Sequence, residues 1–232
     1  MTTDRLPSAE RRDAIIEASL HLFAQHGLHG VTTRQIAEAA GVSEALLYRH
    51  FRSKEELFTE LQRSCLSSTR RVADQVAKLE PSTSTLVLAI YFMVASILRC
   101  GPGTERTQSI RRMMLGSLRD DGAFARGFLR ENLTRFMPKL DECVHAAGRA
   151  GDLVDRVRKS SARLYFTHHL AAMIGMMQLP KPHVIDYGID GEALVAEAVQ
   201  FVLRGIGVKQ DAIERHFNPR ALSLLVQAFA ET

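Results

Sequence analysis

Hydrophobic residues recur at helical spacing along most of the chain. Ile15, Ala18, Leu22 and Phe23 share one face of a helix expected at about residues 9–26, and Gly27 is placed to end it. No run alternates between apolar and polar residues over the length of a strand. The pattern therefore predicts an all-α fold, with further helices at about residues 83–99, 105–119, 122–148, 154–178, 190–206 and 219–230.

Two helix starts stand close together after the first helix. Thr32 with Gln35, and Ser53 with Glu56, each fit a capping box, in which side chains satisfy the unpaired backbone N–H groups of a helix start. Between them lies Gly41, which can adopt the left-handed conformation of a tight turn. This order predicts two short helices joined at the glycine, as in a helix-turn-helix.

A longer helical pattern follows the second capping box. It runs from Ser53 to Glu80, where Pro81 stops it, and we expect one long helix there. We therefore predict a three-helix, helix-turn-helix DNA-binding domain at residues 1–53, joined by the long helix to a larger helical domain at residues 54–232. Pro138 lies inside an otherwise helical pattern, which predicts a kink or a break.

The exposed start of the second short helix carries the groups suited to reading DNA. In a helix-turn-helix, the N-terminal residues of the second helix meet base edges in the major groove. Here these residues are Ser43, Glu44, Ala45 and Leu46. Glu44 can accept from cytosine N4, and Leu46 can contact a thymine methyl group. Arg34, in the first short helix, can reach guanine or a phosphate.

Net charge alone does not identify a DNA-binding protein here. The chain carries a formal charge of +4, but residues 1–60 hold seven Lys and Arg against nine Asp and Glu. The basic groups are instead clustered: Arg49, His50, Arg52 and Lys54 follow one another at the end of the second helix. We predict that Tyr48, His50 and Lys54 contact phosphates, which fix the register without reading the sequence.

Several motifs in order make the N-terminal region similar to a known family. They are Phe23-Ala24-Gln25-His26-Gly27, Thr32-Thr33-x-x-Ile36-Ala37, Gly41-Val42-Ser43, Leu47-Tyr48-x-His50-Phe51 and Ser53-Lys54-x-x-Leu57. Residues from about 9 to 60 resemble the DNA-binding domain of the tetracycline-repressor (TetR) family of bacterial transcription regulators. The alternative is that Gly41 merely joins two helices of an ordinary bundle.

The resemblance implies both a partner and a set of contacts. Family members are all-α homodimers whose larger C-terminal domain binds a small molecule and shifts the spacing of the two DNA-reading heads. The resemblance implies DNA contact by Thr33, Arg34, Ser43, Glu44, Ala45, Tyr48, His50 and Lys54. One departure matters: the acidic Glu44 at a base-reading position is not a general phosphate binder, so the operator sequence does not carry over from the family.

Flexible and aromatic side chains are abundant after Pro81. Residues 86–98 contain one clearly polar side chain, Ser96, which predicts a helix surrounded by others. Methionine adapts to irregular partners, so this composition suits a pocket for an apolar or aromatic effector, although ordinary core packing explains it equally well. The candidate ligand-binding residues are Phe92, Met93, Met114, Phe128, Asn132, Phe136, His169, Met173 and Met177.

Two later helices present more apolar surface than one contact needs. Small residues leave room for close helix approach in one of them, and the other carries two apolar faces, which predicts a dimer interface. By resemblance, two helices from each subunit would form a four-helix bundle. The candidate interface residues are Ala171, Ala172, Gly175, Val195, Val199, Val202 and Ile206.

The remaining composition narrows the choice of function class. The three cysteines, Cys65, Cys100 and Cys143, are widely spaced, which argues against a disulfide framework and fits a reducing cytoplasm. We find no secretory signal, apolar run of membrane-spanning length, metal-ligand spacing, cofactor motif or ordered catalytic motif. We expect a cytoplasmic, non-enzymatic regulator with double-stranded operator DNA and a small-molecule effector as partners. The alternative is a ligand-independent DNA-binding adaptor whose C-terminal domain holds a protein partner.

Overall fold

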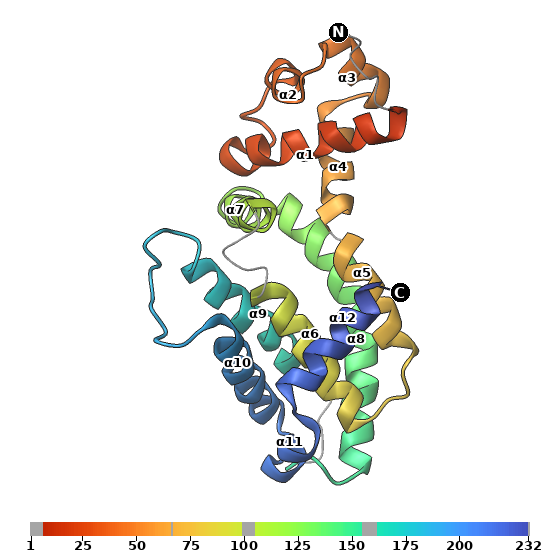
Figure 1. Ribbon diagram of the computed structural model, residues 1–232, viewed down its shortest axis with the longest axis vertical. Helices are drawn as coiled ribbons and strands as arrows, with labels where there is room; N and C mark the ends of the chain where they lie inside the picture. The colour runs from red at the N-terminus through yellow and green to blue at the C-terminus, as the bar shows by residue number, and fades with distance from the viewer. Residues whose placement is uncertain (1–6, 66, 99–104, 155–161, 232) are drawn as a thin grey trace. The chain divides into compact units, whose positions relative to one another are not determined.

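The computed structural model describes residues 7–65, 67–98, 105–154 and 162–231 (Figure 1). Within these ranges the regular structure is helical, apart from one isolated bridge between Leu153 and Val208. The helices are α1 Ser8–His26, α2 Thr33–Ala39, α3 Glu44–His50, α4 Lys54–Cys65, α5 Ser67–Lys78, α6 Thr83–Leu98, α7 Glu105–Arg119, α8 Ala123–Arg149, α9 Ala162–Met177, α10 Gly191–Ile206, α11 Gln210–His216 and α12 Pro219–Glu231. The predicted all-α fold is confirmed.

The chain divides into two compact units that do not follow a single cut in the sequence. The first comprises Met1–Ser67 and Glu105–Leu129, and the second comprises Ser68–Thr104 and Arg130–Thr232. The first unit therefore holds the helix-turn-helix together with α4, α7 and the beginning of α8. The predicted boundary after residue 53 does not coincide with an edge of the first unit, because α4 contacts α1 and belongs to that unit. The division into a DNA-binding and a ligand-binding domain stays a prediction.

The first unit is built around α1. This helix contacts α2, α4 and α7, and it buries Ile15, Leu20 and Phe23 completely or nearly so. The ring of Phe23 meets the edge of Phe58 from α4, with 5.1 Å between ring centroids. Burial of each of these side chains stabilises the fold by roughly 1.5–3 kcal/mol. The short helices α2 and α3 are thereby held on a rigid support.

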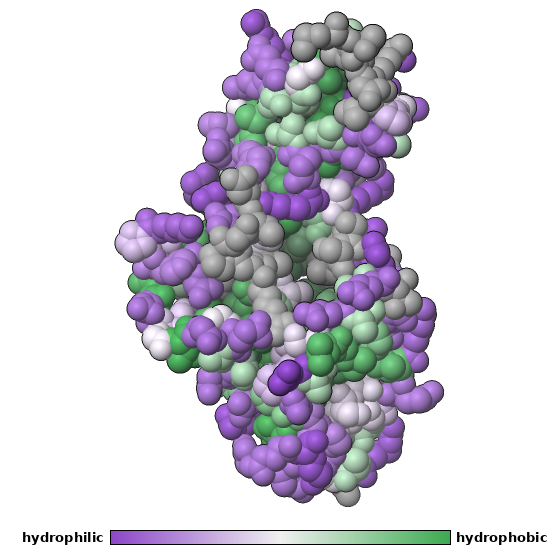
Figure 2. Space-filling model, in the orientation of Figure 1, coloured by the Kyte–Doolittle hydropathy of each residue, from purple (hydrophilic) through white to green (hydrophobic). Residues whose placement is uncertain are grey.

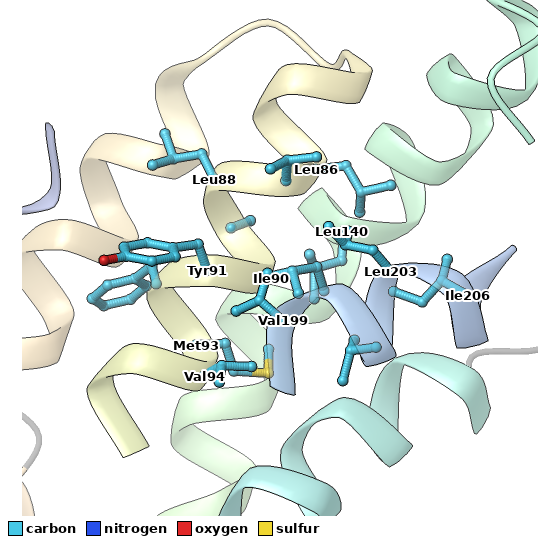
Figure 3. Close-up of a cluster of buried hydrophobic side chains, with 14 of the residues drawn as sticks. Leu86, Leu88, Ile90, Tyr91, Met93, Val94, Leu140, Val199, Leu203 and Ile206 are labelled. Atoms are coloured by element: carbon cyan, nitrogen blue, oxygen red, sulfur yellow. The ribbon is translucent and has the colours of Figure 1, made fainter. Parts of the chain in front are cut away.

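The second unit is built around α6. This helix contacts α9, α10, α11 and α12, and its residues from Leu86 to Ala95 are all buried. Figure 3 shows α6 side chains such as Leu86 and Ile90 meeting Leu140 from α8 and Val199 from α10. The predicted central apolar helix is confirmed, because a helix that is hydrophobic on every side has to be covered on every side.

A buried carboxylate ties the start of α6 to the C-terminal helices. Asp152 accepts a hydrogen bond of 2.6 Å from the Thr83 hydroxyl and one of 2.6 Å from Arg215 Nη2 in α11. The backbone N–H of Lys209 donates to the carbonyl of Asp152 at 2.9 Å. The buried hydroxyl of Thr83 and the buried carboxylate thus satisfy each other, as burial of polar groups requires.

The helices of the structure can be compared with those expected from the sequence. The long helix expected between residues 53 and 80 is covered by α4 and α5, which are separated only by residue 66, outside the described ranges, so a single helix there stays a prediction. Of the kink or break expected at Pro138, the break is wrong, because α8 continues through this residue. The short α11 was not expected. The first residues of the helix predicted at 154–178 lie outside the described ranges, and α9 begins at Ala162.

The described residues offer neither a membrane-crossing helix nor a cluster of side chains fit to hold a metal ion. No helix among them combines the length and the apolarity that a bilayer demands. No group of three His, Cys, Asp or Glu side chains comes together in those same ranges. Cys65 and Cys143 are buried free thiols, and Cys100 lies outside the described residues.

Candidate nucleic-acid interface

The start of α2 is fixed by the predicted capping box. The Thr32 hydroxyl accepts from the backbone N–H of Gln35 at 3.2 Å, and the Gln35 side chain accepts from the backbone N–H of Thr32 at 2.8 Å. Two N–H groups that a helix start leaves unpaired are satisfied in this way. The exposed side chain of Arg34 and the half-buried one of Thr33 are consequently held at a defined helix start.

The turn between α2 and α3 depends on glycine. Gly41 adopts φ +64°, a conformation that L side chains rarely accept. The backbone N–H of Gly41 donates to the carbonyl of Glu38 at 3.1 Å, and that of Val42 donates to the carbonyl of Ala37 at 2.9 Å. The chain therefore reverses tightly, and Ile36, Ala37 and Leu47 form the buried contact between the two helices.

The recognition helix α3 begins with a capped and exposed turn. The Ser43 hydroxyl accepts from the backbone N–H of Leu46 at 3.2 Å. Ser43, Glu44 and Ala45 are exposed, whereas Leu46 is half-buried. Burial of Leu47 and Phe51 on the opposite face anchors the helix to the rest of the unit. The side chains predicted to read base edges therefore share one accessible surface, with Leu46 at its border.

A polar cluster joins the starts of α2 and α3. The Thr33 hydroxyl donates to Glu44 Oε2 at 3.0 Å, and the Tyr48 hydroxyl donates to Thr33 Oγ1 at 3.5 Å. All three residues belong to the predicted DNA-contact set. The sequence suggested a separate role for each of them, but the structure brings them together and shows that the Glu44 carboxylate is oriented by a neighbour.

Arg34, on the same surface, forms an ion pair with an acidic side chain and lies near a second one. Arg34 Nε donates to Glu38 Oε1 at 2.9 Å, one helical turn further along α2. This hydrogen bond, together with the charges of Glu38 and Glu44, raises the pKa of Arg34. Both partners of the pair are well exposed, so the guanidinium can exchange Glu38 for a phosphate or a base at small cost.

The basic cluster at the end of α3 and the start of α4 has both exposed and half-buried side chains. Lys54 is half-buried, and its Nζ donates to the carbonyl of Val31 at 2.8 Å, which links the start of α4 to the loop before α2. His50 is also half-buried. Arg49 and Arg52 are exposed but were left out of the predicted contact set. Their place in the basic cluster was the signal that could have included them.

The predicted ligand-binding residues do not form one group. Phe92 and Met93 are buried in α6, and the Phe92 ring stacks on Phe136 with 5.4 Å between centroids and 20° between planes. Met114 and Phe128 belong to the first unit. In α9, Met177 is half-buried, while His169 and Met173 are exposed. The side chain of Asn132 lies outside the described residues.

A partly buried histidine adjoins the exposed His169. The rings of His168 and His169 meet edge to face, with 5.8 Å between their centroids. Burial, with a smaller contribution from His169, lowers the pKa of His168 to about 4. Within the described part of the chain, its Nδ1 atom is buried and has no hydrogen-bond partner. This imidazole is therefore uncharged at neutral pH.

The predicted dimer residues lie mainly inside the single chain. In α10, Val195, Val199, Val202 and Ile206 are buried, and so are Ala171 and Gly175 in α9, with Ala172 half-buried. Periodicity located an apolar face correctly, but that face packs within the second unit. Other apolar side chains of the two helices are exposed: Phe166 at 62%, Met173 at 54% and Phe201 at 66% of their surface.

Comparison with known proteins agrees with the geometry of the first unit. Residues 15–61 match the family model described as bacterial regulatory proteins, tetR family. The HTH-type transcriptional regulator BetI of Agrobacterium fabrum is 30% identical over 184 residues, which cover 73% of this chain and 82% of BetI. A match of that length is longer than the first unit and therefore includes part of the second unit.

Two further proteins bear on different parts of the chain. The nucleoid occlusion factor SlmA of Haemophilus ducreyi is 34% identical over 98 residues, so that the match spans 42% of this chain and about half, 48%, of that relative. The crystal structure of AibR in complex with isovaleryl coenzyme A and operator DNA aligns with a TM-score of 0.61 and 19% identity, covering 82% of this chain and 97% of AibR. This structural likeness shows a shared fold.

Proposed function

The chain belongs to the tetR family of bacterial regulatory proteins, and from this membership we propose that it is a ligand-responsive regulator that binds a near-palindromic operator as a homodimer. Its relatives include DNA-binding transcription regulators. The observation that carries the proposal is the exposed start of α3, where Ser43 caps the helix and Thr33 orients Glu44. Repression is the expected sign of regulation, with the effector releasing the protein from DNA.

The DNA-reading module, at residues 1–53, would place α3 in the major groove. Glu44 and Ala45 would meet base edges there, and Arg34 would leave Glu38 for guanine or a phosphate. Tyr48 and the exposed Arg49 and Arg52 would contact the backbone around them. The cationic contacts are limited to three arginines, so specificity depends on groove contacts supported by a small number of phosphate anchors.

The exposed faces of α9 and α10 supply the dimer contact. Phe166, Met173 and Phe201 are large apolar side chains left open to solvent on two helices that pack against each other. Residues buried beneath them, such as Val199, support this surface from within the subunit. Two copies joined about a twofold axis would present two α3 helices to half-sites about one helical turn apart, roughly 34–36 Å.

The proposed effector is a small apolar or aromatic molecule bound in the larger helical domain. The stacked rings of Phe92 and Phe136 lie in the core of that domain and are aromatic side chains of the kind that such ligands contact. AibR, which shares the fold, has been crystallised with isovaleryl coenzyme A and operator DNA. An effector lowers DNA affinity only if it binds more tightly to the dimer whose heads no longer fit the operator.

Selection from random double-stranded DNA with the full chain tests this function directly. We expect an enriched inverted repeat whose recovery is lost in the double variant Glu44→Ala with Tyr48→Ala. The matched control is Glu214→Ala, which removes an exposed carboxylate from α11 in the second unit. Recovery of no common sequence, or equal loss in the control, would reject α3 as the reading element.

The dimer contact is tested separately by sedimentation of Phe201→Glu, with Leu118→Glu as control. Phe201 and Leu118 are both well exposed, but only Phe201 lies on the proposed dimer face. We expect the Phe201 variant to become monomeric and to lose operator binding, while the control remains dimeric. Dimers of unchanged strength in both variants would place the interface elsewhere.

A further inference from the structure

The last helix, α12, carries a stripe of apolar side chains that are exposed in the described part of the chain. Its buried side is formed by Leu222, with Val226 and Phe229 packed partly against the core around α6. On a second face, Leu224 is exposed at 61% and Leu225 at 41% of their surface. Figure 2 shows hydrophobic surface over α12 in the same orientation as Figure 1. The helix is therefore apolar on two sides, and within the described residues one of these sides is packed against the core.

The spacing of the exposed residues defines one straight stripe. Ala221, Leu224, Leu225 and Ala228 are all exposed and follow the pattern i, i+3, i+4, i+7, which lies along one face of an α-helix. The helix start is firm, because Asn218 Oδ1 accepts from the backbone N–H of Ala221 at 3.1 Å. Small residues at both ends of the stripe allow another helix to approach closely.

The stripe reads the same in both directions. Reversing the helix exchanges Ala221 with Ala228 and Leu224 with Leu225, so an antiparallel copy of α12 presents matching positions. A twofold axis between two such helices would bring leucine against leucine at the centre and alanine against alanine at each end. Interfaces of this self-complementary kind are the common form in symmetric oligomers.

The charges beside the stripe are complementary in the same arrangement. Arg220 and Glu231 are exposed and lie on one flank of the stripe, at opposite ends of the helix. With a rise of about 1.5 Å per residue, antiparallel pairing places Arg220 of one copy within about 3 Å, along the helix axis, of the level of Glu231 in the other. In a parallel twofold pair, this flank of each helix would lie on the opposite side of the seam from that of its partner, so Arg220 and Glu231 would not meet.

From these observations we propose that α12 pairs antiparallel with α12 of a second copy. Four side chains from each copy form a smaller contact than the roughly 800 Å² per partner of a standard stable interface. This pairing is therefore a secondary contact that associates the dimers formed through α9 and α10, and in that respect it rests on the proposed function. The partner of α12 is a second copy of this chain, because both the apolar pattern and the flanking charges are self-complementary.

Sedimentation of the full chain over a range of concentrations tests the pairing. We expect the wild type to associate beyond the dimer, and Leu224→Glu to weaken that step by about tenfold to a hundredfold because it places a charge in a buried seam. Leu118→Glu changes a leucine of nearly equal exposure, 59%, outside α12 and serves as the control. Unchanged association of Leu224→Glu, or equal weakening in both variants, would overturn the proposal.

Charge exchange tests the antiparallel register. Arg220→Glu and Glu231→Arg should each weaken association by roughly two- to fivefold, as exposed ion pairs do, and the double variant should restore it. Failure of the double variant to restore association would overturn this arrangement. These substitutions are on the surface, so circular dichroism should show unchanged helix content in every variant.

Phe201→Glu separates this proposal from that of the α9–α10 dimer. If the Phe201 variant still forms a pair that Leu224→Glu then dissociates, the α12 contact is supported independently. If Phe201→Glu has no effect and Leu224→Glu alone yields monomers, the α12 pairing stands and the proposed dimer face fails. If only Phe201→Glu acts, the dimer face stands and the α12 pairing is wrong.

Discussion

Glu44 provides the sharpest test of how this protein reads DNA. Its carboxylate stands at the exposed start of α3, and Oε2 accepts a hydrogen bond of 3.0 Å from the Thr33 hydroxyl. A carboxylate has about four lone-pair sites, so this bond leaves acceptor capacity for cytosine N4. Glu44→Ala removes the acceptor and a negative charge together. The prediction is that one base pair in each half-site loses its discrimination, while the others keep theirs.

The expected magnitude follows from the energy of a base contact. A well-formed contact contributes about 1–3 kcal/mol of discrimination, which corresponds to roughly fivefold to 150-fold in relative affinity. Glu44→Ala should abolish a preference of that size for cytosine. Glu44→Gln retains the shape and an acceptor for Thr33, but its amide suits adenine, so the preference should move from cytosine toward adenine.

The assay is competition binding at fixed salt with a selected operator and its single-base variants. Thr33→Val is the matched control, because it keeps the shape of Thr33 but removes the donor that orients Glu44. It should weaken discrimination at the same base pair, and by less than Glu44→Ala. A uniform change in affinity at all positions would refute the assignment of Glu44 to base reading.

Three further predictions concern the anchors and stability of the molecule. Tyr48→Ala and Lys54→Ala should both weaken binding to all sequences. Only Lys54→Ala removes a cation, so it should also reduce the slope of log affinity against log salt by about 0.9, and an unchanged slope for this variant would contradict its phosphate role. Thr32→Ala removes the capping box of α2 and should cost about 1 kcal/mol of unfolding free energy, seen as a lower urea midpoint of the first unit, with Thr32→Ser nearly neutral. The pKa of His168 is about 4 in the folded chain and 6.5 unfolded, so acid favours unfolding: stability should fall by up to about 3 kcal/mol between pH 6.5 and 4. His168→Gln should lose that part of the pH dependence in urea titrations, and identical pH profiles for the two proteins would contradict the burial of a neutral imidazole.

The helix-turn-helix was predictable because its determinants are local. A capping box, a turn glycine and a helix start lie within about a dozen residues, and each imposes its geometry without help from distant parts of the chain. Thr32, Gly41 and Ser43 all play the parts that the sequence indicated. Their side-chain partners were harder, because the bond between Thr33 and Glu44 depends on how α2 and α3 cross.

Helix boundaries without local markers were not predictable. The seven residues of α11 are too few to display a clear period, and no side chain caps its start. Pro138 predicted a kink or a break, and the structure excludes the break because α8 continues through this residue.

The apolar faces of α9 and α10 show why exposure had to come from the structure. Periodicity marked Val195, Val199 and Val202 as a continuous face, but it could not say whether α6 or another subunit covers them. Because α6 packs against both α9 and α10 and also carries Phe92, one helix connects the aromatic stack with the proposed dimer surface. A ligand that separates Phe92 from Phe136 would have to move α6 or its neighbours, since a close-packed interior has little room to absorb the change. The geometry of the dimer face would then depend on the ligand through the packing of the second unit alone.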